Sequence, residues 1–311
     1  MTNHLFGAIV TSPGVAANNR GENEGNMTTL QKILWQGEVH STVSSESIRW
    51  AMRLGWQNRG LDVNRNWNEI TRKHEWEDAG FAKGGEPFID DDVLGYMSAE
   101  AAKEEVNVEA ENGAPPARGK KPRGTATIRR SRFEVARALS VTPWNGDVIF
   151  NVASIGATPS ASKTGRDPVP YSGEVHATRY QYGFALTPEQ LLQPDRALAV
   201  VDAVVDLAEV AGNHARFLFD FSPDTLIFRW TDDAAPRILY PFRLDGNGQL
   251  TVPELIRRIR AKDILASELI IGGSLAETAD GETLRSLGAT VFSGVKEAAA
   301  TVKGLLTKAG K

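Results

Sequence analysis

The 311-residue sequence predicts a mixed α+β fold. Segments with strand-like alternation are interspersed with segments of helical periodicity, without the strict strand–helix–strand repeat of a parallel α/β protein. The chain shows no internal repeat, and its length suits one domain that carries long insertions. Hydrophobic residues make up 41% of the chain and charged residues 24%, which is typical of a soluble globular protein.

Two strands and two helices are predicted before residue 57. In order, they are a strand at residues 4–12, a helix at 28–35 with Thr28 or Thr29 as its cap, a strand at 38–43, and a helix that begins at Ser44 or Ser45. The last helix has the serine that an N-cap prefers, followed by apolar residues at helical spacing. A polar loop, residues 18–26, separates the first strand from the first helix.

Residues 57–127 predict an insertion into the main fold. Large aromatic residues stand there, or at its start, among glycine, asparagine and charged residues: Trp56, Trp67, Trp76, Phe81 and Phe88. An acidic stretch and two consecutive prolines follow. We therefore expect a small core of its own and a flexible tip near residues 107–124.

The rest of the chain again alternates between strand and helix patterns. The predicted elements are strands at 147–152 and 174–186, a helix from Thr187 to Ala208, strands at 214–221 and 226–230 with 237–244 as a further candidate, a helix at 253–261, a strand at 268–272 and a helix at 291–306. Residues 156–173 carry almost no periodicity and are rich in Gly, Pro and Ser. Loops of this length in compact domains are usually functional or disordered.

The composition excludes several classes of protein. The chain has no cysteine, so it forms no disulfide, thiolate nucleophile or cysteine-based zinc site. No stretch reaches the roughly 18 consecutive apolar residues of a membrane span, and the N-terminus lacks the basic flank of a secretion signal. We expect a soluble, cytoplasmic protein without a membrane partner.

The net charge of −4 hides a strong asymmetry along the chain. Residues 86–111 contain nine acidic residues and one lysine, whereas residues 118–137 contain eight basic residues and one glutamate. Such asymmetry predicts a site for a polyanion on one face. Two solvated charge runs that compensate each other are the alternative.

The polar loop has the composition of a phosphate-binding loop. Its glycines let the backbone approach a ligand closely, and its side chains offer amides and one guanidinium fork. The candidates are Asn18, Asn19, Arg20 and Asn23. The loop is not a P-loop, because no Gly-Lys-Ser/Thr follows. A solvent loop that satisfies its own backbone through Asx turns is the alternative.

The helix that begins at Ser44 or Ser45 contains a second set of candidates. Arg49 and Arg53 are four residues apart and share one face of the helix. Ser45 adds a hydroxyl group, and the helix N-terminus adds unpaired N–H groups. Together they would form a track for a nucleic-acid backbone. An ordinary N-cap with two solvated arginines has the same sequence pattern.

Two further basic segments complete the candidate interface. Arg130 and Arg132 are two residues apart, so strand alternation would send them to one side. The long loop contributes Lys163, Arg166 and Tyr171, which combine cations with a ring that could stack on a base. A disordered surface loop is the alternative for this segment.

The sequence predicts no catalytic site, metal site or cofactor. The five histidines are scattered and share no metal-ligand spacing. His40 and His176 fall in predicted strands, where a structural histidine is more common than a general base. Residues 90–92 are three aspartates, for which a solvated acidic turn is favoured over a weak cation site.

Several of these segments together resemble a known family. The residues that carry the resemblance are Phe6-Gly7, the polar loop, Lys32, Trp35, residues 37–40, residues 44–53, and residues 167–171 and 178–182. They resemble the DevR-type branch of the Cas-seven family, the backbone subunits of CRISPR type I effector complexes, with subtype I-B favoured. Residues 44–53 resemble the wider family's serine-serine-glutamine, lysine-arginine helix, with Glu46 in place of the common glutamine.

The resemblance implies a modified RRM-like (ferredoxin-like) palm with a fingers insertion and a long thumb hairpin. The palm would comprise residues 1–56 and 128–311, the fingers residues 57–127, and the thumb loop residues 156–173. Several copies would line up along CRISPR RNA, beside other Cascade subunits, and present the guide to a target DNA strand in antiviral defence or guided transposition. Ser45, Arg49 and Arg53 would hold RNA phosphates.

Two alternatives to this non-catalytic RNA scaffold remain open. A metal-dependent ribonuclease of the type III backbone kind would use a loop aspartate, for which Asp167 is the candidate. A DNA-binding developmental regulator is the other alternative, although the sequence shows no helix-turn-helix.

Overall fold

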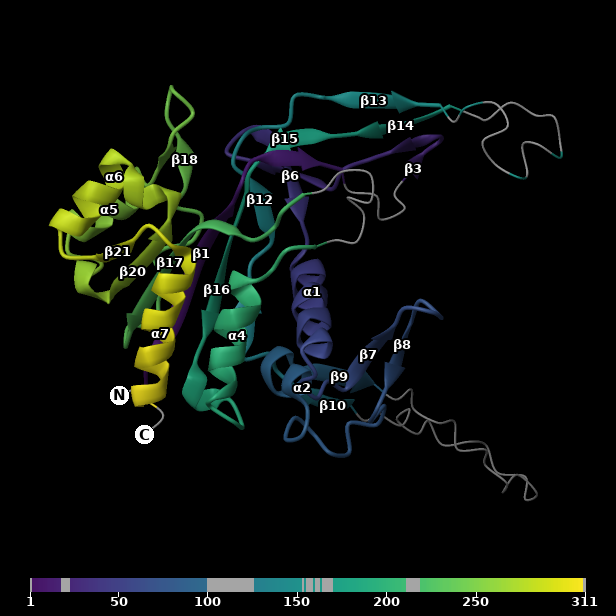
Figure 1. Cartoon of the computed structure of the whole chain (residues 1–311), viewed down its shortest axis with the longest axis horizontal. Coiled ribbons are helices and arrows are strands. Elements are labelled where there is room, and N and C mark those ends of the chain that lie inside the picture. Colours follow the sequence, from purple (N-terminus) through teal and green to yellow (C-terminus); the bar gives the residue numbers. More distant parts are fainter. Residues whose placement is uncertain are drawn as a thin grey trace, which may run out of the picture.

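The protein forms a mixed α+β fold around one large sheet (Figure 1). The structure is a computed structural model, and it describes residues 2–17, 23–99, 126–152, 154, 159, 163, 170–210 and 219–309. The mixture of helices and strands within these ranges confirms the predicted fold class at this level.

Nine strands form the central sheet in the described part of the chain. Their order is β21 (Thr290–Phe292), β20 (Leu269–Gly273), β17 (Pro223–Thr231), β1 (His4–Thr11), β16 (Tyr180–Leu186), β12 (Ala138–Ser140), β6 (Glu38–Val43) and β5 (Lys32–Trp35), and β11 (Phe133–Val135) also pairs with β16. Neighbouring strands are antiparallel, except that β20 and β21 are parallel. The first strand of the chain therefore lies between β16 and β17, in the interior of the sheet.

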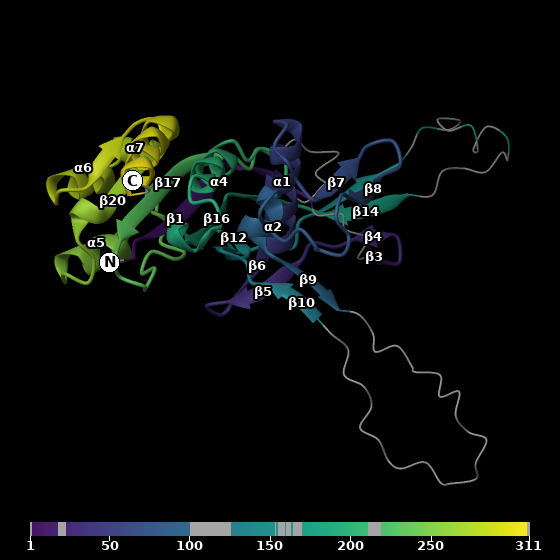
Figure 2. The ribbon, with the colours of Figure 1, turned by 90° about the horizontal axis from the view of Figure 1, so that it is seen from below.

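Apolar side chains cover both faces of this sheet. Along β1 they alternate, so Leu5 and Ile9 join one cluster while Phe6 and Val10 join the other. The first cluster also holds side chains of α1 (Ser45–Asn58), α4 (Arg196–Val205) and α7 (Val295–Ala309), and the second holds those of α5 (Pro253–Arg260) and α6 (Ala279–Ser286). Figure 2 shows α4 and α7 on one side of the strands and α5 on the other.

Smaller sheets extend from the central one. One contains β13 (Val148–Asn151), β14 (Tyr171–Glu174), β4 (Met27–Thr28) and β3 (Asn23–Glu24), while β2 (Gly14–Ala16) pairs with β15 (His176–Thr178) and β18 (Arg243–Leu244) pairs with β19 (Leu250–Thr251). The described residues also include the short 3-10 helices η1 (Pro188–Gln190), η2 (Ala266–Glu268) and η3 (Ser274–Glu277). In Figure 1, β13 and β14 point away from the central sheet. The predicted thumb loop, residues 156–173, follows β13, and its last residues form the start of β14. Most of the loop lies outside the described residues.

The predicted insertion packs against α1 through β7. The structure describes its residues 57–99 and 126–127. These contain the hairpin of β7 (Arg65–Asn68) and β8 (Lys73–Trp76), the short helix α2 (Ile89–Leu94), and the antiparallel pair β9 (Tyr96–Ala99) and β10 (Ala126–Arg129). Ile89, Val93 and Leu94 belong to the first cluster of the main core. The expectation of a separate small core is therefore wrong for α2, whose apolar side chains complete the main core.

The prediction of a helix at residues 28–35 is wrong. Lys32–Trp35 form β5, which pairs with β6 through a two-residue turn at Gln36 and Gly37. Both turn residues have positive φ, 52° and 88°, which is the backbone of a type I′ hairpin turn. Pairing across this turn outweighs the weak helical spacing of the segment.

Other predicted boundaries also shift. The strand predicted at 174–186 is divided into β14, β15 and β16. The helix expected from Thr187 begins as α4 at Arg196, after η1, and the final helix begins at Val295, after β21. The sequence predicts no helix at the position of α6. In contrast, the predictions of β1, β6, α1, α5 and β20 are confirmed to within a few residues.

The candidate strand at 237–244 does not form over its whole length. Arg237 and Tyr240 have positive φ, which L-residues rarely adopt inside a strand. Only Arg243–Leu244 is a strand. The strand predicted at 214–221 lies mostly outside the described residues.

Candidate nucleic-acid interface

Helix α1 begins with a side-chain cap. The Ser44 hydroxyl oxygen accepts a hydrogen bond from the Ser47 N–H at 3.2 Å, and Ser44 has an extended backbone. The sequence allows either Ser44 or Ser45 as the N-cap, and the structure shows that it is Ser44. The Ser45 hydroxyl instead donates to the Glu46 carboxylate at 3.2 Å. Ser45 is half-buried in the first turn and has no role in the cap.

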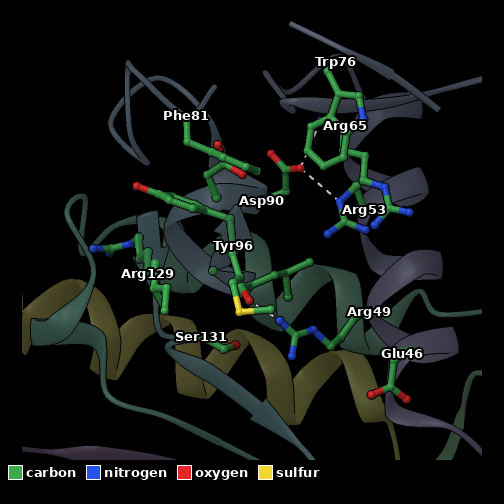
Figure 3. A pocket seen from close by; sticks show the side chains of 15 residues that line it. Glu46, Arg49, Arg53, Arg65, Trp76, Phe81, Asp90, Tyr96, Arg129 and Ser131 are labelled. Atoms are coloured by element: carbon green, nitrogen blue, oxygen red, sulfur yellow. Dashed lines mark hydrogen bonds and ion pairs between the residues drawn. The ribbon is translucent and has the colours of Figure 1, made fainter. Parts of the chain in front are cut away.

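A cavity of about 470 Å³, here called the α1 cavity, opens between α1 and the insertion (Figure 3). Arg49 and Arg53 line it from α1, as their shared helix face predicts. The other lining residues are Glu46, Arg65, Trp76, Phe81, Asp90, Asp91, Leu94, Gly95, Tyr96, Met97, Ile128, Arg129 and Ser131. The face of α1 that carries Arg49 and Arg53 is therefore partly covered by the insertion.

Arg53 is bound to a buried carboxylate in this cavity. Its Nε lies 3.0 Å from Asp90 Oδ2, and the Asp90 side chain is 1% exposed. The same carboxylate accepts the backbone N–H groups of Asn64 at 2.7 Å and Arg65 at 3.2 Å. Arg53 therefore has a structural role that its sequence position does not reveal, and Asp90 partly balances its charge.

Arg49 and Arg65 have no ion pair among the described residues. Arg49 donates through Nη2 to the Leu94 carbonyl oxygen, whereas Arg65 Nε is buried without a hydrogen-bond partner in the described part of the chain. Burial lowers the pKa of both guanidinium groups, and the nearby charge of Arg53 lowers each pKa further. A bound anion would offset this concentration of positive charge.

The prediction that residues 90–92 form a solvated acidic turn is wrong. The three side chains are 1%, 3% and 0% exposed. Asp92 accepts the Leu192 N–H at 2.9 Å, forms an ion pair with Arg196 at 2.8 Å, and pairs with Arg129. These partners offset the large penalty of burying a carboxylate. No cluster of His, Asp or Glu that could hold a metal ion occurs within the described ranges.

Asp91 differs from its neighbours because its pKa is raised. Burial and the charge of Asp90 raise the pKa of Asp91 from 3.8 to about 7, against a hydrogen bond from Asn64 Nδ2 at 2.8 Å. Asp91 is therefore about half protonated near neutral pH. Because it lines the α1 cavity, the negative charge of the cavity decreases as the pH falls below this value.

Arg130 and Arg132 lie in a second cavity, of about 390 Å³. Both line it, but the strand whose alternation is predicted to bring them to one side does not form: they follow β10, and Ser131 between them lines the same cavity. Arg130 is 78% exposed and pairs with Glu134 at 2.5 Å, and Arg132 donates to Gln190 at 3.1 Å. Ser131 lines both cavities, so the two sets of arginines are neighbours.

Several predicted site residues lie outside the described part of the chain. They are Asn18, Asn19, Arg20, Arg166 and Asp167, and of Asn23 only the backbone is described, in β3. Lys163 is exposed, and Tyr171 is half-buried at the start of β14. The roles of these residues stay predictions.

Arg65, Trp76 and Tyr96 belong to the α1 cavity but are not among the predicted site residues. They come from β7, β8 and β9, so only the folded insertion brings them together. Their single signal in the sequence is the enrichment of aromatic residues in the insertion. That pattern is equally typical of a small core.

His40 and His176 are structural residues, as predicted. His40 Nδ1 lies 2.8 Å from the Ser140 carbonyl oxygen, and His176 Nδ1 lies 2.7 Å from Ser41 Oγ. Both side chains are buried, and burial lowers the pKa of His176.

None of the described helices is long and apolar enough to cross a membrane.

The fold places the chain in a class of known structures. It is similar to a chain of a solved "CRISPR RNA-guided surveillance complex", with a TM-score of 0.57 and 16% identity over 96% of this chain and 99% of the other. A chain of a second such complex, described as pre-nicking, gives a TM-score of 0.57 and 13% identity over 97% of this chain and 99% of the other. At these identities the likeness concerns the fold.

Sequence comparison defines the family. Residues 12–210 match the family model described as "CRISPR-associated negative auto-regulator DevR/Csa2". The chain is also 48% identical over 302 residues to the "CRISPR-associated protein Cas7/Cst2/DevR" of Myxococcus xanthus (strain DK1622), with 95% of each chain covered. The chain belongs to the DevR/Csa2 family, which confirms the resemblance noted in its sequence.

Proposed function

We propose that the protein is an RNA-binding backbone subunit of a CRISPR type I effector complex and that it has no catalytic role. The observation that carries the proposal is the placement of Arg49 and Arg53 on one face of α1, in a cavity beside the insertion. Membership of the DevR/Csa2 family supports it. So does a fold shared with chains of RNA-guided complexes, which would work in the cytoplasm.

The RNA backbone would run across the start of α1. Ser45 and the N-terminal N–H groups of the helix would bind phosphate oxygens, followed by Arg49 and the outer nitrogens of Arg53. Arg130 and Arg132 would extend this path, because their cavity adjoins the α1 cavity at Ser131. Such contacts recognise the sugar–phosphate chain and not its sequence. The polar loop and the thumb residues would close over the same strand.

The order of the central strands supports an RRM-like palm. The strands β17, β1, β16 and β12 are neighbours in that order, and each neighbouring pair is antiparallel. The helices α1 and α4 pack on the same face of these strands. A split βαβ, or ferredoxin-like, unit would have the same strand order and the same placement of helices, which supports the proposal. Residues 57–127 would then be the fingers, and residues 156–173 the thumb loop.

Contacts with further copies of the chain would build the backbone of the complex. Exposed apolar side chains support such contacts, because Leu34 on β5 is 74% exposed and Phe150 on β13 is 80% exposed. Copies aligned in this way would hold the guide for pairing with a target DNA strand, together with other subunits of the complex. The biological role would be antiviral defence or guided transposition.

A charge reversal on α1 tests the proposal. Arg49→Glu should weaken binding of single-stranded RNA, whereas Arg59→Glu, at the far end of the same helix, should leave it unchanged. Among the described residues Arg59 forms an ion pair only with Asp206, at the surface and at 2.6 Å, so its loss changes stability little. Affinity for the unaltered protein should fall steeply with salt, with a slope near −0.7 per phosphate contact for single strands.

Two results would contradict the proposal. One is an RNA affinity that does not depend on salt, because phosphate contacts would then be absent. The other is equal RNA binding by the Arg49→Glu and Arg59→Glu variants. In that case the arginine face of α1 would not be the RNA site.

The description of the matching family model favours one further candidate, a DNA-binding regulator. That description contains the words "negative auto-regulator". Preference for duplex DNA from the protein's own promoter over single-stranded RNA, measured at one salt concentration, would support it. Equal or weaker binding of the duplex would reject it.

A further inference from the structure

The rings of Trp76, Phe81 and Tyr96 contact one another along the lining of the α1 cavity, and they are here called the aromatic wall. The ring centroids of Trp76 and Phe81 are 5.6 Å apart at an interplanar angle of 82°, and those of Phe81 and Tyr96 are 4.2 Å apart at 6°. Phe81 is 8% exposed and anchors the other two. Trp76 is 44% exposed, so part of its indole surface is available to a ligand. Because the Trp76 ring is nearly perpendicular to the stacked rings of Phe81 and Tyr96, Trp76 is the ring on which a flat ligand could stack.

Cationic groups lie directly beside this wall. The Arg65 guanidinium carbon lies 5.4 Å from the centre of the Trp76 ring, and Figure 3 shows both at the same side of the cavity. Arg65 Nε is buried without a partner among the described residues. Arg49 reaches the cavity from the facing helix. A ligand with an aromatic face and an adjoining anionic group would match both features.

The balance of charge limits the ligand to a small anion. The lining residues include four guanidinium groups, on Arg49, Arg53, Arg65 and Arg129, and three carboxyl groups, on Glu46, Asp90 and Asp91. Arg129 is paired with Asp92, which does not line the cavity, and Asp91 is about half protonated near neutral pH. The net charge of the lining is therefore small, which suits a single phosphodiester better than a triphosphate. The volume of about 470 Å³ lies in the range of small-molecule sites.

We propose that the α1 cavity is a nucleotide site that holds one unstacked base against Trp76, with the adjoining phosphate at Arg49 and Arg65. Where the nucleotide is part of bound RNA, this inference rests on the proposed function and deepens it. A base in a duplex has both faces covered by its neighbours, so only an unstacked base fits. The same chemistry could also come from a free mononucleotide.

Stacking at the wall is tested with a matched pair of tryptophan variants. Trp76→Ala removes the exposed ring of the cavity, and Trp35→Ala removes a half-buried tryptophan on β5 that contacts Tyr240 and does not line the cavity. Trp76→Ala should weaken binding of short single-stranded RNA about 5- to 160-fold, the usual effect of losing one base–aromatic stack. Trp35→Ala should bind RNA like the unaltered protein.

Abasic RNA separates stacking from a general loss of structure. A series of RNAs would each carry one abasic ribose at a different position. Binding to the unaltered protein should be weaker when the abasic ribose occupies one particular position for each bound copy. In Trp76→Ala the same substitution should cause no further loss. A second arm measures binding of uridine and adenosine monophosphate, and Trp76-dependent binding there would identify a free nucleotide as the ligand.

The two proposals fail in different ways. If Arg49→Glu loses RNA while Trp76→Ala and abasic RNA bind normally, and no mononucleotide binds, the nucleotide site is overturned and RNA binding stands. If no variant changes RNA binding, the assigned RNA site fails. Mononucleotide binding that needs Trp76 would then still support the cavity as a nucleotide site.

Discussion

Arg53 and Arg65 line the same cavity, but different forces hold them there. Arg53 is bound to Asp90, whereas Arg65 Nε has no partner in the described part of the chain. Arg53→Ala should therefore lower the free energy of unfolding by about 1–3 kcal/mol, because Asp90 stays buried without its charged partner. Arg65→Ala should lower it by less than about 1 kcal/mol and act mainly on RNA affinity.

Urea unfolding of both variants measures this difference. Adding Asp90→Asn to Arg53→Ala should recover part of the lost stability, since it removes the unpaired charge. Equal destabilisation by Arg53→Ala and Arg65→Ala would show that the ion pair with Asp90 contributes nothing.

Asp91 gives the protein a predictable pH dependence. Its pKa is raised from 3.8 to about 7, so the folded state binds a proton more tightly than the unfolded state. The stability from this proton is fully present below about pH 3.8 and is lost as the pH rises through 7. Asp91→Asn should therefore raise the free energy of unfolding at pH 8 by more than about 1 kcal/mol.

The gain from Asp91→Asn should shrink as the pH falls toward 5. Urea denaturation of both proteins at several pH values measures it, and the difference between them isolates this one carboxyl group. A constant difference across this range would mean that Asp91 titrates at its ordinary pKa.

At the scale of the element, the two serines at the start of α1 have separate roles. Ser44→Ala removes the hydrogen bond to the Ser47 N–H and should cost about 1 kcal/mol of stability. Within the described part of the chain, Ser45→Ala breaks only the contact with Glu46, so stability should change little while RNA affinity falls. Thermal unfolding and RNA titration of the pair measure both effects. Loss of stability in Ser45→Ala alone would reverse the assignment.

Asp92 connects the insertion to the main fold. This carboxylate joins Arg129 at the end of β10 to Arg196 at the start of α4. Asp92→Asn should destabilise this connection by about 3 kcal/mol, because two half-buried arginines lose their buried counter-charge. Hydrogen exchange should show faster exchange in β9 and β10 than in the unaltered protein, with β1 and β17 unchanged. A uniform increase across the chain would argue against a local fastening.

Elements with a strong local pattern are those that the sequence predicts correctly. The helix α1 has a serine cap and regular apolar spacing, and β1 has a run of apolar residues that suits a strand buried on both faces. In contrast, β5 depends on the Gln36-Gly37 turn and on pairing with β6, which outweigh the spacing of its own residues. Tertiary pairing, and not local preference, decides such short segments.

At the scale of the whole molecule, the candidate site is partly encoded in local sequence. Arg49 and Arg53 follow from helical spacing alone. Arg65, Trp76 and Tyr96 join them only because three strands of the insertion fold against α1. The burial of residues 90–92 could not be predicted either, since its partners include Arg196, which is distant in sequence.

The sequence of the nucleic acid that co-purifies with the protein tests the central claim most directly. The protein would be expressed in cells that carry a CRISPR array, and its bound nucleic acid would be compared with total RNA. We expect strong enrichment of RNA transcribed from the array, and loss of that RNA in Arg49→Glu but not in Arg59→Glu. Recovery of unenriched cellular RNA, or of duplex DNA alone, would contradict a role as the guide-RNA backbone.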